Sequence, residues 1–485
     1  MAISEHPRRA GRFRALFEHL PKVAFGLSLL MLAFGYGVAT IKYRLFPYPL
    51  LTRAQQAYTA LHKVEDTTRP PHFLRFLEPG ETGRILKPAT SALLDQTDLI
   101  LMSGSFFHRT DICPKIGCLA WIMRRDGTVL HRWSVDPAKL FNTADFKGFS
   151  GFPGVENIMV WGLDLDREGN LVIIFQARNA FPDAFGIVKL APDGRLLWKR
   201  IDHSHHWPTV GPDGRIYTPI SRIIPRPKTA GGLPYPNNCQ GDTIDDQGVR
   251  VLAPDGAVLH EFWFTDIARQ SGLRVLEYLV RGDCDPFHAN GIDLVNDPMA
   301  AKLRAMGVAD AKPGDLIVSL RSSSSVVIMD SETGRIKHVV HGPMIEQHSP
   351  ATLPDGSLLI FDNVGASTGN DLRSRVLRIS LAPERNEQVF PRAGIDDPHL
   401  YSKREGQVNV SPDGKRVLVS EGEGGRLFEV ELTTGKVLWA YREVADIAAY
   451  EARVGAKPSG RLALMHVQGA SYVSQADYAR MFGGT

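Results

Sequence analysis

The sequence predicts an all-β fold, a six-bladed β-propeller preceded by one N-terminal transmembrane helix. Short β-rich runs joined by turns of the Asp-Gly or Gly-Asn type repeat from about residue 95 to the end, and a long uncharged apolar run lies near the N-terminus. The expected divisions are a cytoplasmic basic tail at 1–22, an anchor at 23–41, a stalk and linker at 42–94, and the propeller at 95–485.

The N-terminal segment has the length and charge pattern of a membrane anchor. Residues 23–41 are nineteen positions without a charged side chain, which as a helix approach the roughly 30 Å of a bilayer core. Five basic residues precede this run and only Lys42 and Arg44 follow closely, so the positive-inside rule predicts a cytoplasmic N-terminus. The body is then exported, to the periplasm or the cell exterior, on a single pass through the inner membrane. A signal peptide cleaved near Gly37-Val38-Ala39 is less favoured, because the apolar run is too long.

The charge balance argues against a nucleic-acid partner. The net charge of +3 is carried by residues 1–22, and the remainder is balanced. Phosphate binding needs a clustered basic surface, which the later stretches lack. The sequence therefore predicts a membrane contact through residues 23–41 and no nucleic acid, while the oligomeric state, a homo-oligomer included, stays open.

Four cysteines in an exported chain suggest disulfides. Cys113 and Cys118 are expected to staple one loop, and Cys239 with Cys284 could close the segment before His288, although the sequence does not fix this pairing. Before them, Phe46-Pro47-Tyr48-Pro49 ends the anchor helix, and residues 53–66 are expected to form a short amphipathic stalk helix.

Alternating hairpins define the blades of the predicted propeller. One kind ends in apolar residues, and the other ends in mixed strands that often close on Trp or His. Paired in order, they give six blades near 98–134, 158–201, 204–264, 286–341, 346–391 and 405–442. A helix is expected at 297–307, and LALMHV at 462–467 is a candidate closing strand.

Histidines recur at one position of this repeat. In four of the hairpins, the residue eight places before the turn glycine is Trp161, His206, His348 or Gly406. In the fourth blade the turn is longer, and His288 precedes Asn296 by the same eight positions. Equivalent positions on first strands should point to one end of the central channel, so three histidines in register predict a site there. The other histidines considered, expected at the surface or behind the site, are His203, His205, His341 and His399.

Two further side chains should join this site. Arg321 follows the second strand of the blade that His288 begins, and its planar guanidinium suits a tetrahedral oxyanion. Asn290 shares a strand face with His288. Arg222 and Asn363 end neighbouring hairpins and are weaker candidates, Arg222 being equally well explained as a rim salt bridge.

Four segments resemble the bacterial arylsulfotransferases: HANGIDL, GDLIVSLRSSSSVVIMDSETGRI, QHSPATLPDGSLLIFDN and EGGRLFEV, within 288–430. The resemblance implies a periplasmic six-bladed propeller that moves a sulfuryl group from a phenolic sulfate ester to another phenol, without a nucleotide donor, through a sulfohistidine. It implies His348 as nucleophile, with His206, His288, Asn290 and Arg321 around it. The family's best-known members are soluble and carry a cysteine pair just before the nucleophile, whereas this chain is anchored and has no cysteine after Cys284.

The residues fit that chemistry, and two other classes stay open. A neutral imidazole is a competent nucleophile near pH 7, and a second histidine, His206 or His288, could protonate the leaving phenolate. No cofactor or metal is expected. The alternatives are a metal-dependent lyase or hydrolase, with Gln407 beside the three histidines, and a non-catalytic membrane-tethered binding propeller. The metal alternative would require a carboxylate ligand, and none falls on the histidine register.

Overall fold

The computed structural model describes residues 10–43, 45–47, 50, 75–77, 81, 83–94, 98–105, 107–113, 117–146, 158–177, 184–228, 239, 241–271, 284–453, 457 and 459–483. The chain divides into two compact units, Met1–Arg69 and Pro70–Thr485. The stalk helix expected at 53–66 lies outside the described residues.

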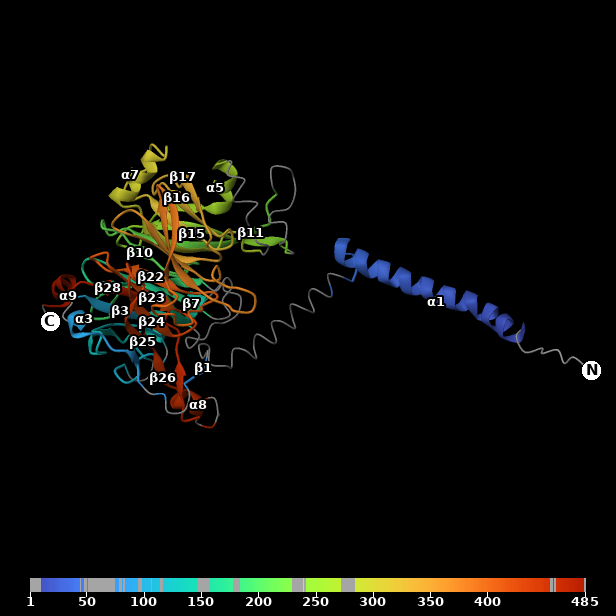
Figure 1. Cartoon of the computed structure of the whole chain (residues 1–485), viewed down its shortest axis with the longest axis horizontal. Helices are drawn as coiled ribbons and strands as arrows, with labels where there is room; N and C mark the ends of the chain where they lie inside the picture. The colour runs from blue at the N-terminus through green and yellow to red at the C-terminus, as the bar shows by residue number, and fades with distance from the viewer. Residues whose placement is uncertain are drawn as a thin grey trace, which may run out of the picture. The chain divides into compact units, whose positions relative to one another are not determined.

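Among its described residues, the first unit contains one long helix, α1 (Ala10–Tyr43). Its stretch Leu20–Thr40 is long and apolar enough to cross a membrane. The side chains of Leu30, Met31 and Phe34 are largely exposed, as expected of a helix whose apolar surface faces lipid. The sequence prediction of a helix that can span a membrane is thus confirmed (Figure 1).

The second unit is a six-bladed β-propeller, as predicted, with each blade an antiparallel sheet. Five blades have four strands each, ordered from inside to outside as β28 (Ala470–Val473), β3 (Leu99–Ser103), β4 (Ala120–Met123), β5 (Val129–Trp133); β6 (Ile158–Leu165), β7 (Leu171–Ala177), β8 (Ala184–Leu190), β9 (Leu196–Arg200); β10 (Thr209–Val210), β11 (Ile216–Pro225), β12 (Thr243–Leu252), β13 (Val258–Trp263); β14 (Ala289–Leu294), β15 (Leu316–Leu320), β16 (Ser325–Met329), β17 (Ile336–His341); and β18 (His348–Thr352), β19 (Leu358–Asp362), β20 (Arg375–Leu381), β21 (Glu384–Phe390). The sixth blade has five: β22 (Gln407–Val410), β23 (Arg416–Glu421), β24 (Arg426–Glu431), β25 (Val437–Arg442) and β2 (Ile85–Lys87).

The remaining elements connect or cover the blades. They are β1 (Arg75–Phe76), β26 (Val444–Asp446) and β27 (Leu462–Leu464), which form a separate three-stranded sheet, and the helices α3 (Ser91–Leu94), α4 (Pro137–Leu140), η1 (Thr143–Phe146), α5 (Phe264–Ser271), α7 (Asp297–Ala305), α8 (Ala448–Arg453) and α9 (Gln475–Phe482). The predicted helix at 297–307 is therefore confirmed as α7. Strand β2 falls in the segment that the sequence assigns to the linker.

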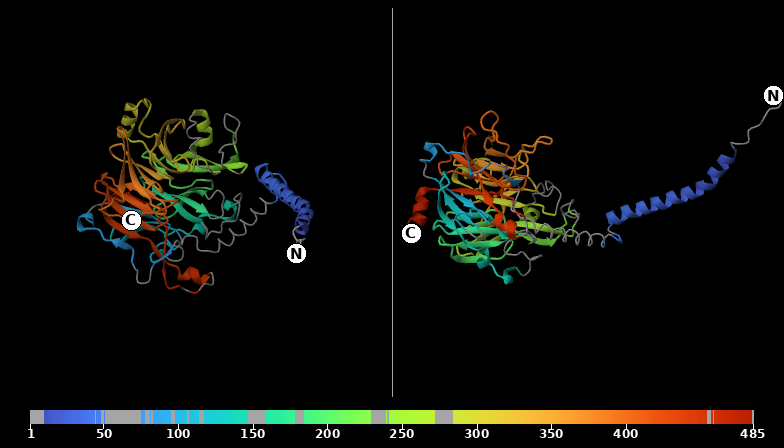
Figure 2. Two further views of the ribbon diagram at one scale, coloured as in Figure 1. Left: turned by 45° about the vertical axis from the view of Figure 1, so that its right-hand side comes forward. Right: turned by 90° about the horizontal axis from the view of Figure 1, so that it is seen from below.

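The repeated turn residues set the hairpins. The turn Gly169, for example, has φ of +80°, a left-handed conformation that glycine adopts without a steric penalty. Because the turns recur at a fixed spacing, the blades follow one another in chain order around the propeller, as the ribbon colours show (Figure 2). The blade of β22–β25 consequently lies beside the one that holds β3–β5 (Figure 1).

The C-terminal segment closes the propeller, but not through the predicted strand. Residues 462–464 form β27, which pairs with β1 and β26, whereas the closing strand is β28, which pairs with β3 in the first blade. The prediction at 462–467 is therefore wrong. The runs at 462–467 and 470–473 are both short and apolar, so the sequence pattern does not show which one closes the propeller. Only the pairing of 470–473 with the edge of β3 distinguishes them.

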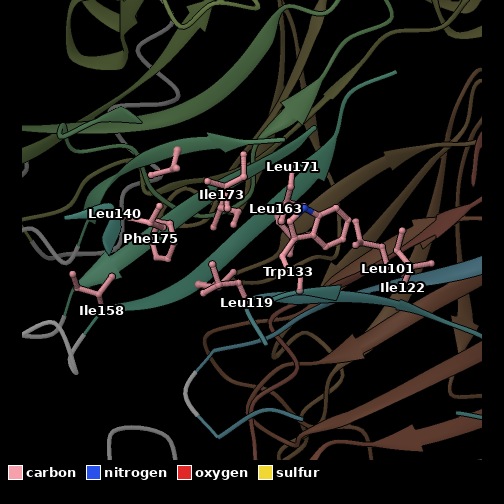
Figure 3. Packing of buried hydrophobic residues seen from close by; sticks show 14 of the residues in the cluster. Leu101, Leu119, Ile122, Trp133, Leu140, Ile158, Leu163, Leu171, Ile173 and Phe175 are labelled. Atoms are coloured by element: carbon pink, nitrogen blue, oxygen red, sulfur yellow. The ribbon is translucent and has the colours of Figure 1, made fainter. Parts of the chain in front are cut away.

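Apolar side chains fill the space between neighbouring blades. Figure 3 shows Leu119 and Trp133 of the first blade near Leu163 and Phe175 of the second. The Trp133 indole Nε1 also donates to the carbonyl of Ala191, at 3.2 Å. Because the blades pack face to face in this way, the starts of the inner strands are held at fixed positions around the channel.

Both expected disulfides form. Cys113 bonds to Cys118 within one loop, and Cys239 bonds to Cys284, immediately before Asp285. The Cys239–Cys284 disulfide links the segment just before β12 to the segment that leads into β14.

Candidate active site

Three histidines meet where the inner strands of neighbouring blades begin. His348 is the first residue of β18, as predicted, whereas His206 and His288 lie just before β10 and β14. Their φ angles of +57° and +51° are left-handed, which interrupts a strand. The expectation that all three lie on first strands is therefore wrong for His206 and His288. Non-glycine residues in this conformation are often found at functional sites.

The three rings lie within reach of one small substrate. Ring centroids are separated by 5.1 Å for His206–His288, 6.0 Å for His206–His348 and 6.5 Å for His288–His348. One nitrogen from each ring lies within 4.8 Å of the others. Gly162 of the neighbouring blade leaves room for the backbone of His206, because a Cβ there would lie 2.4 Å from the carbonyl oxygen of His206. The predicted convergence of the histidine register is thus observed.

The orientation of His348 is fixed by Asn363. The amide Nδ2 of Asn363 donates to the carbonyls of Ser402 and Glu405, at 2.8 and 2.9 Å, so its Oδ1 faces His348 as an acceptor. That oxygen accepts from Nδ1 of His348 at 2.8 Å, which assigns the ring proton to Nδ1 and the lone pair to Nε2. Asn363, a weaker candidate in the sequence, therefore contacts His348 directly and orients its ring.

The side of His348 that carries Nε2 is buried. Burial is the main reason that the pKa of His348 is lowered to about 3, which leaves the ring neutral at neutral pH. Its Nε2 is buried and has no hydrogen-bond partner among the described residues. A buried polar atom of this kind marks a place where a ligand can supply the missing contact.

His206 is packed between aromatic rings. Trp161, on the predicted register, lies 4.3 Å from its centroid, and Nδ1 of His205 lies 2.6 Å from its own Nδ1. Burial, and then the neighbouring histidines, lowers the pKa of His206 well below its ordinary value. His205 is thus the residue behind the site, as the sequence suggested, and His206 is a neutral ring.

His288 instead contacts a carboxylate. Its Nδ1 is hydrogen-bonded to Oδ2 of Asp285, whose Oδ1 accepts from the backbone N–H of His288 at 3.1 Å. A carboxylate at Nδ1 fixes the orientation of the ring and directs Nε2 away from Asp285. The Cys239–Cys284 disulfide is adjacent in sequence to Asp285.

Asn290 lies in the site, and a hydrogen bond to Gln347 sets the orientation of its amide group. Its Nδ2 donates to the carbonyl of Gln347 at 2.8 Å, which directs Oδ1 the other way, where it is buried without a partner among the described residues. Asn290 therefore presents its oxygen as an acceptor, and the second N–H of its amide is not used by the bond to Gln347. Gln347 itself is buried and donates to Ser319, Leu320 and Ser325, which is a structural role.

Arg321 reaches the same end of the channel, but it is partly engaged. Its Nη2 donates to Oε2 of Glu346 at 2.5 Å, while its Nε is buried and lacks a partner among the described residues. One nitrogen of the guanidinium is thus paired, and the Nε–H is available to an anion. Arg222, by contrast, pairs with Asp246 and Asp266 and stacks over Trp263, so it is a rim salt bridge.

A small pocket, with a cavity volume of about 30 Å³, opens beside His348. The lining residues not yet placed are Trp207, Ser349, Arg404, Glu405, Gly406, Gln407 and Gln468. Oε2 of Glu405 lies 2.9 Å from Nδ1 of His466. Oε1 of Gln407, the oxygen that the metal alternative would use, accepts from the backbone N–H of Ala470 at 3.0 Å.

Sequence reasoning missed several residues of the site. Asp285 and Glu346 lie three and two residues before His288 and His348, so a local search for acidic neighbours of the register histidines could have found them. Glu405 and His466 had no such signal, because they come from a loop before the sixth blade and from the segment after it.

Comparison with known proteins gives one family and several distant structural neighbours. A family model described as arylsulfotransferase (ASST) matches residues 167–443, more than half of the chain. No curated protein matches it. Among solved structures, a Bacteroides caccae protein of unknown function is similar at 13% identity, with a TM-score of 0.43, covering 78% of this chain and 99% of that one. Virginiamycin B lyase from Staphylococcus aureus is similar at 12% identity, with a TM-score of 0.31, covering 57% and 82%.

Proposed function

The chain belongs to the arylsulfotransferase family, and on that premise we propose that it transfers a sulfuryl group from a phenolic sulfate ester to a phenolic acceptor, with His348 as nucleophile and a sulfohistidine as intermediate. The observation that carries the proposal is the state of His348. Its Nδ1 bears the proton and is held by Asn363, while its Nε2 is buried, neutral and without a partner among the described residues.

In the first half-reaction, Nε2 of His348 attacks sulfur as the bond from sulfur to the phenolic oxygen breaks. The sulfated ring gains positive charge, and its Nδ1–H donates more strongly to Oδ1 of Asn363, already 2.8 Å away. The leaving phenolate takes a proton from a general acid. Of the two histidines considered for that role, we assign it to His288, because the carboxylate of Asp285 is hydrogen-bonded to its Nδ1, whereas His206 has no carboxylate contact of this kind among the described residues and burial lowers its pKa.

In the second half-reaction, neutral His288 takes the proton of the acceptor phenol. The phenolic oxygen then attacks sulfur and the bond from sulfur to Nε2 breaks, which returns His348 to its starting form. Oδ1 of Asn290 is buried without a partner among the described residues and suits the acceptor hydroxyl, which is a donor until it is deprotonated.

The non-bridging oxygens of the sulfuryl group carry the negative charge through both steps. The Nε–H of Arg321 is buried and lacks a partner among the described residues, so it is the donor best suited to them. The salt bridge from Nη2 to Glu346 holds the guanidinium in place. Trp161 and Trp207 line the pocket and offer apolar surface to the aryl groups of donor and acceptor.

The localisation follows from the anchor. We place the N-terminus in the cytoplasm and the propeller in the periplasm or outside the cell, tethered by an uncleaved helix. The five basic residues before residue 23 support this orientation.

A single assay tests the reaction. The full chain, purified in detergent, is incubated with a chromogenic aryl sulfate with and without added phenol. We expect release of the chromogenic phenol to depend on the acceptor and a sulfated acceptor to accumulate in equal amount. Release that is independent of phenol, with inorganic sulfate as product, would instead indicate a sulfatase.

A further inference from the structure

The three histidines also form a geometry that the sulfuryl-transfer proposal does not require. We propose that His206, His288 and His348 bind one divalent transition-metal ion, with zinc the best fit, and that this ion competes with the sulfuryl group for Nε2 of His348. The inference goes beyond the proposed function, because it assigns a second ligand and a mode of inhibition to the site.

The spacing is close to that of a three-histidine metal centre. A tetrahedral zinc ion with imidazole nitrogens at about 2.1 Å holds those nitrogens about 3.4 Å apart. One nitrogen from each of the three rings lies within 4.8 Å of the others, so binding requires the widest of the three separations to shorten by at most roughly 1.4 Å.

Each ring is already oriented by a second residue. Nδ1 of His348 bonds to Asn363, Nδ1 of His288 to Asp285, and Nδ1 of His206 to His205. Histidines that ligate metals usually have such a partner on the other ring nitrogen, which fixes the tautomer and directs the lone pair. With all three Nδ1 atoms engaged, Nε2 is the nitrogen available on each ring.

The ligand set selects the kind of ion. Three imidazoles favour zinc and similar transition metals, whereas magnesium and calcium prefer oxygen ligands. Three protein ligands leave a fourth position open to water or to a substrate oxygen. The Asp285 carboxylate behind His288 adds negative charge near the cation.

Metal binding and sulfuryl transfer use the same lone pair. Nε2 of His348 cannot ligate an ion and attack sulfur at once, so a bound ion should block the first half-reaction. This part of the inference rests on the proposed function, while metal binding itself does not.

The binding experiment needs no activity. The full chain, free of a polyhistidine tag, is purified in detergent, stripped with EDTA and titrated with Co²⁺ while the visible absorption of tetrahedral cobalt is followed. We expect saturation at one equivalent, displacement by one equivalent of Zn²⁺, and no displacement by excess Mg²⁺. X-ray absorption of the zinc-bound protein should report three imidazole ligands. Absence of a saturable site, or a site without histidine, would overturn the proposal.

Substitutions test which residues bind the metal ion. His288→Gln should abolish saturable cobalt binding, and Asp285→Asn should weaken it by about 10- to 100-fold, the usual cost of losing such a second partner. His399→Gln is the matched control, because that side chain is 57% exposed and pairs only weakly with Asp371, and it should bind as the unaltered chain does. Circular dichroism checks that each variant is folded. Unchanged binding by folded His288→Gln would refute the assignment.

An activity measurement distinguishes the metal-binding proposal from the sulfuryl-transfer proposal. Zinc should inhibit sulfuryl transfer, and EDTA should restore it. A chain that binds zinc but transfers no sulfuryl group would retain the metal site and refute the proposed function. A chain that transfers sulfuryl groups but binds no zinc would retain the proposed function and refute the metal site.

Discussion

Oδ1 of Asn363 accepts a hydrogen bond from Nδ1 of His348 at 2.8 Å, and both hydrogens of the Asn363 amide are directed to the carbonyls of Ser402 and Glu405. The amide cannot turn over without losing these bonds. The loop before the sixth blade therefore sets the tautomer of a histidine in the fifth. Asn363 is a positioning residue, because it acts on the substrate only through His348.

Asn363→Ala should lower kcat far more than it changes KM. Without this acceptor only the longer contact with the carbonyl of Glu346, at 3.2 Å, holds the Nδ1 proton, so the proton moves more readily to Nε2. Loss of a tautomer-fixing group can cost up to roughly 10⁴-fold in kcat. Steady-state kinetics with an aryl sulfate and a phenol measure the effect. Ser349→Ala, which removes a hydroxyl bonded to the backbone of Val408 without touching the imidazole of His348, is the control for general disturbance of this region. Equal losses in the two variants would contradict a specific positioning role.

Acid should destabilise the fold through buried histidines, and His108 isolates the effect outside the site. Burial lowers the pKa of His108 to about 3, so between about pH 6.5 and 3 the unfolded chain binds a proton there that the folded chain does not. Its contribution to the free energy of unfolding falls as pH decreases, by about 1.4 kcal/mol per pH unit. Asp164 and Glu443, whose pKa values burial raises to about 7, act in the opposite direction, so the comparison must be made between variants.

His108→Gln should accordingly reduce the acid sensitivity of unfolding. Thermal unfolding from pH 7 to 4.5 should show a smaller loss of Tm for the variant than for the unaltered chain. Parallel curves for the two proteins would show that His108 is protonated in the folded state.

Export of the propeller can be tested without knowing the substrate. A reporter active only in the cytoplasm should be inactive when fused after Thr485, whereas a periplasmic reporter should be active there. Replacing Arg8, Arg9, Arg12 and Arg14 with serine should weaken this preference, because the charge difference across the anchor is then lost. An active cytoplasmic reporter on the unaltered chain would reverse the topology.

The fold was predictable because its signals are local and repeated. Each turn glycine lies at a fixed distance from its strands, so the register that aligned His206, His288 and His348 needed no tertiary information. The closing strand was not predictable, because residues 462–464 and 470–473 have similar apolar patterns and only pairing with β3 separates them. The acceptor orientation of Asn290 depends on the carbonyl of Gln347 in the next blade, a contact that no local pattern encodes.

Removing metal ions should leave sulfuryl transfer intact. The proposed chemistry uses a neutral imidazole, a protonated one and an arginine, and no step needs a cation bound to the site. Turnover should therefore be unchanged after dialysis against EDTA, or increased if the purified chain carries zinc. Loss of turnover that one divalent ion restores would favour the metal-dependent lyase or hydrolase alternative.

His348→Asn should abolish turnover while the propeller stays folded. Removing a covalent nucleophile typically costs several orders of magnitude in rate, and asparagine is close enough in size to fill part of the buried site. Arg321→Lys should be milder, because it keeps a positive charge near the sulfuryl oxygens but loses the planar Nε–H donor. The decisive measurement is mass spectrometry of the unaltered chain mixed with an aryl sulfate and no acceptor. A sulfuryl adduct should appear on the peptide that contains His348 and should disappear when phenol is added. An adduct on the peptide of His206 or His288 would reassign the nucleophile, and full activity of His348→Asn would refute the covalent mechanism.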